Sequence, residues 1–159
     1  MDDISAIKYL EENGIPFKVK TFPEDTEKGT LTIAKVLGVK PEIVVKTLIM
    51  KGHSGKLYLC LIGGESKLHY KKFKKIIEEE DMTMASPSEI HEQTGYEIGA
   101  IPPFALKNRI DVYIDDSLRE NDELYVGAGR FGYEIMISPD NLQKATDGKF
   151  VDIIKNISE

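Results

Sequence analysis

The sequence predicts a mixed α+β fold: one domain over residues 1–159, with a mixed, curled or partly barrel-like β-sheet that short helices flank. Short helical and β-forming segments follow one another irregularly, and some strands are joined as hairpins, whereas a doubly wound parallel sheet requires regular alternation. The chain of 159 residues, 41% of them hydrophobic, is long enough to bury a core without disulfides. No internal repeat or linker-like stretch divides it, so one domain is expected.

The first half of the chain is predicted to form helices and strands that glycine-containing turns separate. Apolar residues at helical spacing predict a helix near the N-terminus that ends at Asn13 and Gly14. Thr30 or Thr32 is the expected N-cap of the next helix, and Gly38 is its stop. The predicted elements are, in order, a helix from residue 3 or 5, a strand over 15–22, a helix to residue 38, and a hairpin of strands over 43–50 and 57–62.

The second half contains two helix starts with strong local signals. Ser86, Pro87 and Glu89 form a capping-box pattern with proline at the first helical position. Ser138 and Pro139 repeat the serine–proline start. The predicted elements are a lysine-rich helix capped by Ser66, a strand over 82–85, a helix ending at Gly95, strands over 111–115, 123–126 and 133–137, a helix ending at Gly148, and an apolar tail over 150–154.

Composition and charge exclude several classes of protein. A net charge of −6 argues against a general nucleic-acid coat protein, and no DNA partner is expected. No apolar stretch approaches the length of a membrane span and no secretory signal pattern opens the chain, so no membrane partner is expected either. The single cysteine, Cys60, lies in an apolar run and is expected to be a buried thiol, which fits a cytoplasmic location.

A lysine stands in the middle of an apolar strand. Lys46 shares a strand face with Val44, Leu48 and Met50, because alternate residues of a strand point to the same side. Burying an unpaired ammonium is costly unless its pKa shifts or an anionic partner is present. The position therefore indicates either a pocket for a negatively charged ligand or an edge strand from which the lysine reaches water.

A cluster of lysines follows the second strand of the hairpin, and acidic residues come directly after it. One interpretation is a solvated amphipathic helix. The other is a local cationic patch for the phosphates of RNA, which an acidic protein can still carry on one face. The lysines of this candidate tRNA contact are Lys67, Lys71, Lys72, Lys74 and Lys75.

The glycine-rich segment from Gly127 to Gly132 matches the spacing of dinucleotide-binding loops, but β-formers rather than a helix follow it. A tight turn between strands and a close approach to a ligand are the two interpretations that remain. The histidines have no metal-ligand spacing to another histidine, a cysteine or an acid, so no metal and no cofactor is expected. No nucleophile elbow or cysteine–histidine pairing predicts covalent catalysis.

The loop from Gly99 to Pro103 carries the strongest local signal. Its two adjacent prolines remove two amide donors and stiffen the backbone. The amides of Gly99, Ala100 and Ile101 remain, and a rigid loop can present them to one carbonyl or anionic oxygen, as an oxyanion site requires. The alternative is a proline-stiffened connector without a ligand.

Taken together, these segments resemble the YbaK/ProX family of aminoacyl-tRNA deacylases, which is related to the editing domain of bacterial prolyl-tRNA synthetase. The motifs are Val45-Lys46-Thr47-Leu48, Thr94-Gly95-Tyr96-x-x-Gly99-x-x-x-Pro103 and Gly127-x-Gly129-Arg130-x-Gly132. The resemblance spans nearly the whole chain. It implies a trans-editing hydrolase that uses an activated water to cleave the ester between a wrong amino acid and the 3′-terminal adenosine of tRNA, with tRNA-Pro as the expected tRNA and no metal or cofactor.

The resemblance also implies roles for individual residues. Lys46 would be the essential lysine that engages the phosphate or ribose of the tRNA terminus. Gly99 would be the second catalytic residue, and its loop would hold the aminoacyl carbonyl and position the attacking water. The residues expected to bind the substrate are Phe22, Thr47, Ala100, Ile101, Pro103, Gly127 and Gly129.

Three positions depart from the family pattern. Cysteine-clearing members often carry tyrosine at the position of Phe22 and serine or another small polar residue at that of Gly127, and many carry glycine at that of Ala105. Losing two hydroxyls from a small pocket can change which amino acid is accepted. One alternative function is a non-catalytic module that binds tRNA or a synthetase. Another is a small-molecule esterase or a pocket for a phosphate ligand on the same scaffold. Prolyl-tRNA synthetase is a candidate partner.

Overall fold

The computed structural model describes residues 4–156. Its helices are α1 (Ser5–Glu12), α2 (Thr30–Leu37), α3 (Tyr70–Ile77), α4 (Pro87–Thr94) and α5 (Pro139–Thr146), with 3-10 helices at Pro41–Ile43 and Asp116–Glu120. Its strands are β1 (Lys18–Thr21), β2 (Val45–Gly52), β3 (Leu57–Gly63), β4 (Met82–Met84), β5 (Asp111–Asp115), β6 (Leu124–Gly127), β7 (Tyr133–Ile137) and β8 (Lys149–Val151). None of these helices is both long and apolar enough to cross a membrane.

The larger sheet contains five strands in the order β4-β2-β3-β5-β8. β2 and β3 form the antiparallel hairpin that the sequence predicts. β5 pairs parallel with β3, and β8 pairs parallel with β5. On the other side of β2, β4 pairs only with residues 50–52. Within the described part of the chain, the outer edge of β2 over residues 46–49 therefore has no strand beside it.

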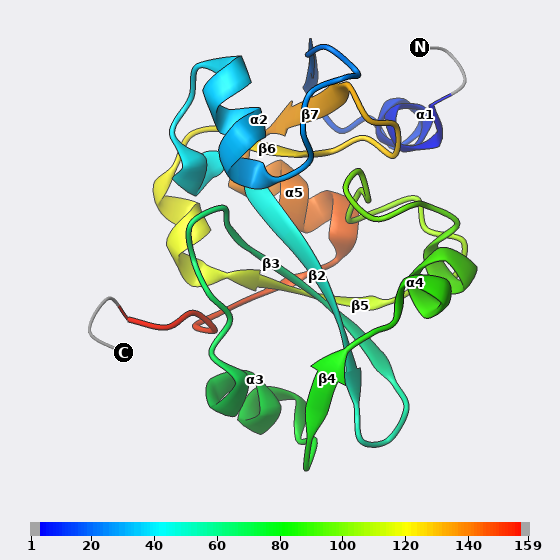
Figure 1. Cartoon of the computed structure of the whole chain (residues 1–159), viewed down its shortest axis with the longest axis vertical. Coiled ribbons are helices and arrows are strands. Elements are labelled where there is room, and N and C mark those ends of the chain that lie inside the picture. Colours follow the sequence, from blue (N-terminus) through cyan, green and yellow to red (C-terminus); the bar gives the residue numbers. More distant parts are fainter. Residues whose placement is uncertain (1–3, 157–159) are drawn as a thin grey trace.

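The smaller sheet is antiparallel and has the order β1-β7-β6. A parallel bridge between Val44 and Tyr125 joins it to the start of β2. In Figure 1 this sheet and α2 lie at one end of the molecule, whereas α3 and β4 lie at the other end. The predicted mixed α+β fold is confirmed, and its strands form two sheets that do not close into a barrel.

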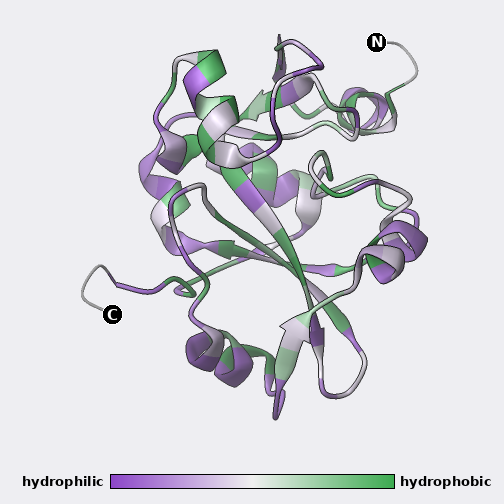
Figure 2. Ribbon diagram, in the orientation of Figure 1, coloured by the Kyte–Doolittle hydropathy of each residue, from purple (hydrophilic) through white to green (hydrophobic). Residues whose placement is uncertain are grey.

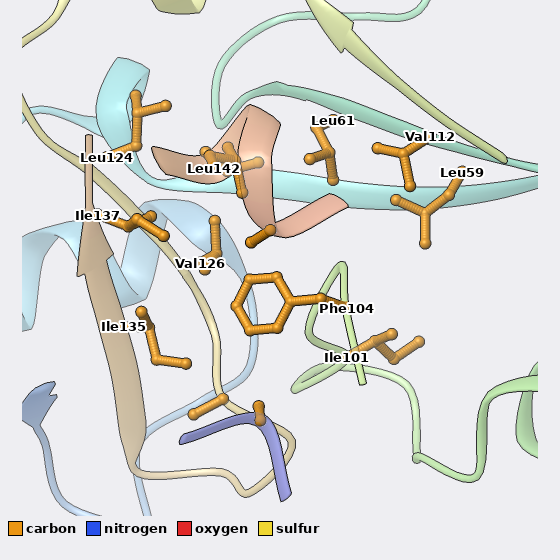
Figure 3. Close-up of a cluster of buried hydrophobic side chains, with 14 of the residues drawn as sticks. Leu59, Leu61, Ile101, Phe104, Val112, Leu124, Val126, Ile135, Ile137 and Leu142 are labelled. Carbon is orange, nitrogen blue, oxygen red and sulfur yellow. The ribbon is translucent and has the colours of Figure 1, made fainter. Parts of the chain in front are cut away.

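The main core unites apolar side chains from both sheets, as Figure 3 shows. Leu59 and Leu61 come from the larger sheet, and Val126 and Ile135 come from the smaller one. The ring of Phe104, from the loop after α4, lies among them. Because full burial of such a side chain stabilises by about 1.5–3 kcal/mol, this cluster holds the two sheets and the loop in fixed positions.

A second cluster lies on the opposite face of the larger sheet, beneath α3. Phe73 of α3 is fully buried, with its ring centroid 6.1 Å from that of Tyr58 and 5.3 Å from that of Tyr113. The rest of α3 is mostly hydrophilic, as Figure 2 shows. Cys60 belongs to the same cluster, and its burial raises the pKa of its thiol. The expectation of a buried thiol is confirmed.

Three helix ends differ from the sequence prediction. α3 begins after His69 rather than after Ser66, because the His69 ring accepts a hydrogen bond of 3.2 Å from the backbone N–H three residues later. α2 begins after Gly29 without a side-chain cap, so neither threonine is its N-cap. α5 ends at Asp147 in the left-handed conformation, not at Gly148. The apolar tail contributes a short strand, β8, that the sequence did not predict.

Candidate active site

A cavity of about 520 Å³ lies beside the uncovered edge of β2. Residues of α2, α4, the loop over 98–101 and the two facing strands β6 and β7 complete its walls. Most of the wall is apolar, and a few polar groups interrupt it. Six of the residues proposed from the sequence line it: Lys46, Thr47, Gly99, Ala100, Ile101 and Gly127.

Lys46 is half-buried and is not paired with a carboxylate among the described residues. Its Nζ donates a hydrogen bond of 3.0 Å to the backbone carbonyl of Ser66, which leaves two of its three donors for a ligand. Burial lowers the pKa of Lys46, and the positive charge of Lys67 lowers it further. Lys67 thus lies close to Lys46, although only Lys46 lines the cavity, and an anion between the two lysines would relieve their repulsion.

Part of the backbone of β2 also faces the cavity. The N–H of Ala85 donates to the carbonyl of Ile49 on the outer edge of β2, at 2.9 Å. Alternate residues of a strand direct their N–H and C=O to the same edge, so the backbone groups of Thr47 point to that edge as well. No described strand pairs there, and the edge offers a donor and an acceptor to a ligand.

The three loop residues whose amides the sequence singles out, Gly99, Ala100 and Ile101, all line the cavity. None of the N–H groups of Gly99, Ala100 and Ile101 donates a hydrogen bond within residues 4–156. Gly99 has a φ of +105°, a conformation that glycine adopts without strain. Ile101 and Phe104 are buried in the main core (Figure 3), so the loop is anchored on its inner side while its amides stay available.

Two glycines of the segment 127–132 fix the loop against the smaller sheet. A Cβ on Gly127 would lie 2.9 Å from the carbonyl oxygens of both Ala100 and Ile101, so only glycine permits this approach. The N–H of Gly129 donates to the Ala100 carbonyl at 2.7 Å, and a Cβ on Gly129 would lie 2.6 Å from the Tyr96 ring. The close approach inferred for these glycines is therefore to the loop.

Glu134 also lines the cavity, although no motif in the sequence pointed to it. It lies on β7 and is 5% exposed, and burial raises the pKa of its carboxyl to about 8. The carboxyl makes no hydrogen bond or ion pair with any residue between 4 and 156. A signal was present, since Glu134 stands between Tyr133 and Ile135 in an apolar strand, as Lys46 does in its own strand.

Three of the proposed substrate-binding residues do not line the cavity. Phe22 is buried next to it, in a small cluster under α2, where its ring meets that of Phe131 edge-on at 5.0 Å. Pro103 lines a separate hollow of about 360 Å³ beside Tyr9 and α5. Gly129 does not line the cavity and instead donates its N–H to the Ala100 carbonyl of the loop. Direct contact with a ligand in the cavity is thus not visible for these three residues.

The lysines of the candidate tRNA contact fall into two groups. Lys67 precedes α3 and lies close to Lys46. The other four are on α3, which covers the far face of the larger sheet. Among them, Lys72 is engaged by the carboxylate of Asp152 at 3.4 Å and by the carbonyl of Ile154 at 3.1 Å. None of the five lines the cavity, and only Lys67 lies close to a residue that does.

The histidines have local roles in the structure. His69 caps α3, His53 lies 3.8 Å from Glu80, and His91 lies 3.1 Å from Glu97. Between residues 4 and 156, no three histidine, cysteine or acidic side chains come together as a metal site would require.

Comparison with known proteins agrees with this site. Residues 27–145 match the family model described as the aminoacyl-tRNA editing domain. A protein of Enterococcus faecalis named "Putative Cys-tRNA(Pro)/Cys-tRNA(Cys) deacylase EbsC" is 24% identical over 150 residues, which cover 94% of this chain and 92% of that protein. A proline–tRNA ligase of Kosmotoga olearia is 31% identical over 101 residues, which cover 64% of this chain but 17% of the ligase.

A solved structure supports the same assignment. The crystal structure described as "a putative trans-editing enzyme for prolyl tRNA synthetase" superposes with a TM-score of 0.86 at 26% identity, and the match covers 96% of this chain and 98% of that one. The matched region of the family model contains β2, the loop at Gly99 and the strands β6 and β7, which are the elements that build the cavity. From its sequence and its fold, this chain belongs to the aminoacyl-tRNA editing domain family.

Proposed function

We propose that this protein is a trans-editing aminoacyl-tRNA deacylase that hydrolyses the ester of mischarged tRNA-Pro with an activated water. The observation that carries the proposal is one cavity that combines Lys46 with three loop amides free of partners within the described chain. The names of its relatives support this reaction class. Such an enzyme would act in the cytoplasm, where charged tRNA is used.

Lys46 would bind a phosphate or the ribose of the tRNA terminus. Its remaining donors suit an oxyanion, and Lys67 adds a second positive charge next to it. Lys67 makes no ion pair among residues 4–156, so it too is available for the tRNA backbone. A bound phosphate would restore the charged form of Lys46, which burial disfavours.

The loop amides would stabilise the transition state of ester hydrolysis. When a water oxygen bonds to the ester carbon, negative charge develops on the former carbonyl oxygen. Donors fixed before this charge appears stabilise it without reorganisation. The N–H groups of Gly99, Ala100 and Ile101 meet this condition, because burial of Ile101 and the contacts of Gly127 and Gly129 hold the loop in place. The intermediate then breaks its bond to the ribose oxygen, which takes the proton that the water has lost.

The test is deacylation of tRNA-Pro charged with cysteine, alanine or proline, with wild-type protein and with Lys46→Ala. We expect hydrolysis of at least one mischarged ester, and a loss of about a hundredfold or more in rate for Lys46→Ala. Lys51→Ala is the matched control. Lys51 lies on the same strand but is paired with Glu89 at 2.8 Å outside the cavity, so its removal should leave the rate unchanged.

Two outcomes would contradict the proposal. If all three esters survive, or if wild type and Lys46→Ala hydrolyse them equally, the prolyl-editing activity is absent. A panel of other charged tRNAs then distinguishes an editing enzyme of different specificity from a non-catalytic module. Retained tRNA binding without hydrolysis of any ester would favour the module.

A synthetase partner is part of the same proposal. The match covers only 17% of the ligase relative, and selectivity for one tRNA would then come from a bound prolyl-tRNA synthetase. Adding this synthetase to the deacylation assay should raise the rate for tRNA-Pro more than for a tRNA charged with the same amino acid but not recognised by it. Equal rates with and without the synthetase would argue against the partnership.

A further inference from the structure

Glu134 combines burial with the lack of any partner in the described structure. Every fully buried side-chain nitrogen or oxygen of residues 4–156 has a hydrogen-bond partner. The Glu134 carboxyl has none, and therefore its oxygens keep contact with the space of the cavity that the residue lines. Native proteins rarely leave such a group unpaired without a functional reason.

Glu134 lies close to the loop that would hold the ester, because its cross-strand neighbour Gly127 contacts that loop. Glu134 on β7 lies directly opposite Gly127 on β6, and side chains at such opposed positions share one face of the sheet. Gly127 in turn contacts the carbonyls of Ala100 and Ile101. A substrate whose carbonyl oxygen is held by the loop amides would therefore carry its amino-acid portion next to this carboxyl.

No cation between residues 4 and 156 neutralises Glu134. Lys20 on β1 is directly opposite on the other side of β7, but it is exposed and forms no ion pair with Glu134. Lys46 lines the same cavity, but its Nζ donates to the Ser66 carbonyl and not to Glu134. A buried carboxylate needs a cation to be stable in its charged form. The cation that fits must come with the ligand.

We propose that Glu134 is the binding site for the α-ammonium group of the aminoacyl ester. This inference depends on the proposed function and makes it more specific. The ester at the end of a tRNA carries phosphate on one side of the reacting carbonyl and a primary or secondary ammonium on the other. For the first group the cavity offers Lys46, with Lys67 close to it, and for the second it offers Glu134. The loop at Ala100 contacts Gly127, the cross-strand neighbour of Glu134.

A substrate class follows from this arrangement. Aminoacyl esters with a free amino group would be accepted, whereas esters with an acylated nitrogen would be rejected because an amide cannot supply a cation. Peptidyl-tRNA and N-acetylated aminoacyl-tRNA belong to the rejected class. The protein would thereby hydrolyse charged tRNA without releasing growing peptides.

The first experiment compares esters. Single-turnover deacylation is measured for the preferred mischarged tRNA and for its N-acetylated form, with wild type, Glu134→Gln and the exposed control Glu123→Gln. We expect wild type and the control to prefer the free amino group by about tenfold or more. Glu134→Gln should lose this preference by slowing only the reaction of the free-amino ester. Equal slowing of both esters, or no preference in wild type, would overturn the proposal.

A second experiment does not depend on catalysis and separates the two proposals. The probe is 3′-alanylamino-3′-deoxyadenosine 5′-phosphate, whose amide bond replaces the ester, together with its N-acetylated form. At pH 7 the Glu134 carboxyl holds a proton, and pairing with the ammonium would release it. Calorimetry in buffers of different ionisation enthalpy should therefore detect about one proton released per probe bound by wild type, and none by Glu134→Gln.

The outcomes of the two experiments are distinguishable. Proton release and tighter binding of the free-amino probe support the Glu134 site even if wild type hydrolyses none of the esters, in which case only the deacylase function fails. Hydrolysis with equal binding of both probes and no proton release means the reverse: the deacylase stands and the ammonium site is wrong. A cooperative thermal unfolding transition of Glu134→Gln at neutral pH, at a temperature no lower than that of wild type, confirms that the variant is folded.

Discussion

Gly127 and Glu134 are cross-strand neighbours, and the absence of a side chain on Gly127 leaves room for the loop at Ala100 and Ile101. The two sheets come together at this point, because β6 also bridges to Val44 at the start of β2. The cavity therefore has rigid strands on two sides and a loop anchored in the core on the third. A site assembled in this way keeps its donors in position without a ligand.

Gly127→Ala should displace the loop and lower the deacylation rate. The new methyl would lie 2.9 Å from two backbone carbonyl oxygens, which cannot move as a flexible side chain does. We expect a loss of about 1–3 kcal/mol in unfolding free energy and a fall in rate of about tenfold or more. Urea unfolding and single-turnover deacylation measure the two effects.

Gly14→Ala is the control for lost stability alone. Gly14 has a φ of +65° with no atom near the position of a Cβ, and it does not line the cavity. Alanine there costs about 1–2 kcal/mol of backbone strain but should leave the rate unchanged. If Gly14→Ala and Gly127→Ala lower the rate equally, the effect of Gly127→Ala comes from lost stability and not from displacement of the loop.

Glu134 should make the folded protein less stable as the pH rises. Burial raises the pKa of its carboxyl from 4.5 to about 8, so between these values the folded state keeps a proton that the unfolded chain releases. The free energy of unfolding therefore falls with pH through this window. Each unit of pKa difference corresponds to about 1.4 kcal/mol, so the effect is on the order of a few kcal/mol.

Glu134→Gln isolates this effect, because glutamine has the same shape and cannot ionise. The difference in unfolding free energy between the variant and wild type should grow in favour of the variant from pH 5 to pH 8.5. Urea unfolding at several pH values measures it. A difference that stays constant with pH would mean that the Glu134 carboxyl is not held protonated.

Gly52 and Glu79 should be coupled. The Glu79 carboxylate accepts hydrogen bonds from the Ser54 N–H at 3.0 Å and the Tyr58 hydroxyl at 2.7 Å, and these bonds lower the pKa of Glu79. A Cβ on Gly52 would lie 2.2 Å from its Cδ, so Gly52→Ala must displace the carboxylate and break these bonds.

The measurement is a double-mutant cycle of unfolding free energies with Gly52→Ala and Glu79→Ala. We expect both single variants to be less stable than wild type and the double variant to be no less stable than Glu79→Ala alone. Strict additivity would show that Gly52→Ala acts through another contact. Because the pKa of Glu79 is lowered, the loss in Glu79→Ala should shrink as the pH falls and the wild-type carboxylate takes up a proton.

Local signals in the sequence predicted the features that depend on neighbouring residues. The capping box at Ser86 and Glu89 and the hairpin around Gly55 form as predicted, because their partners lie within a few residues. The division into two sheets and the strand β8 depend on pairing between distant segments, which periodicity does not encode. Ala105 has a φ of +58°, which explains why glycine would suit that position.

In the site, too, local sequence signals pointed to some residues, whereas the positions of others depend on the folded chain. Lys46 was predictable because a lysine in an apolar strand is costly without a purpose, and Glu134 carried the same signal but pairs with Gly127 only in the folded chain. Phe22 and Pro103 were assigned from resemblance, but the direction in which a side chain leaves a loop depends on packing. Residues that bind through backbone amides leave little trace in the sequence beyond glycine and proline.

The lysines of α3 other than Lys72 test whether tRNA extends beyond the cavity. A triple variant of Lys71, Lys74 and Lys75 to glutamine should weaken tRNA binding if the helix contacts phosphates. Each lost contact should reduce the slope of log K against log salt by about 0.7–0.9. Lys72 is left unchanged because its ammonium is held by Asp152 and a backbone carbonyl.

The matched control replaces three exposed lysines elsewhere, Lys8, Lys18 and Lys149, with glutamine. It changes the net charge equally, so a purely long-range effect would weaken binding in both variants by the same amount. Because α3 covers the far face of the larger sheet from Thr47 and the loop at Gly99, the rate at saturating enzyme should not change in the α3 variant. A salt dependence identical in both variants would mean that α3 is a solvated helix and that tRNA is held at Lys46 and Lys67.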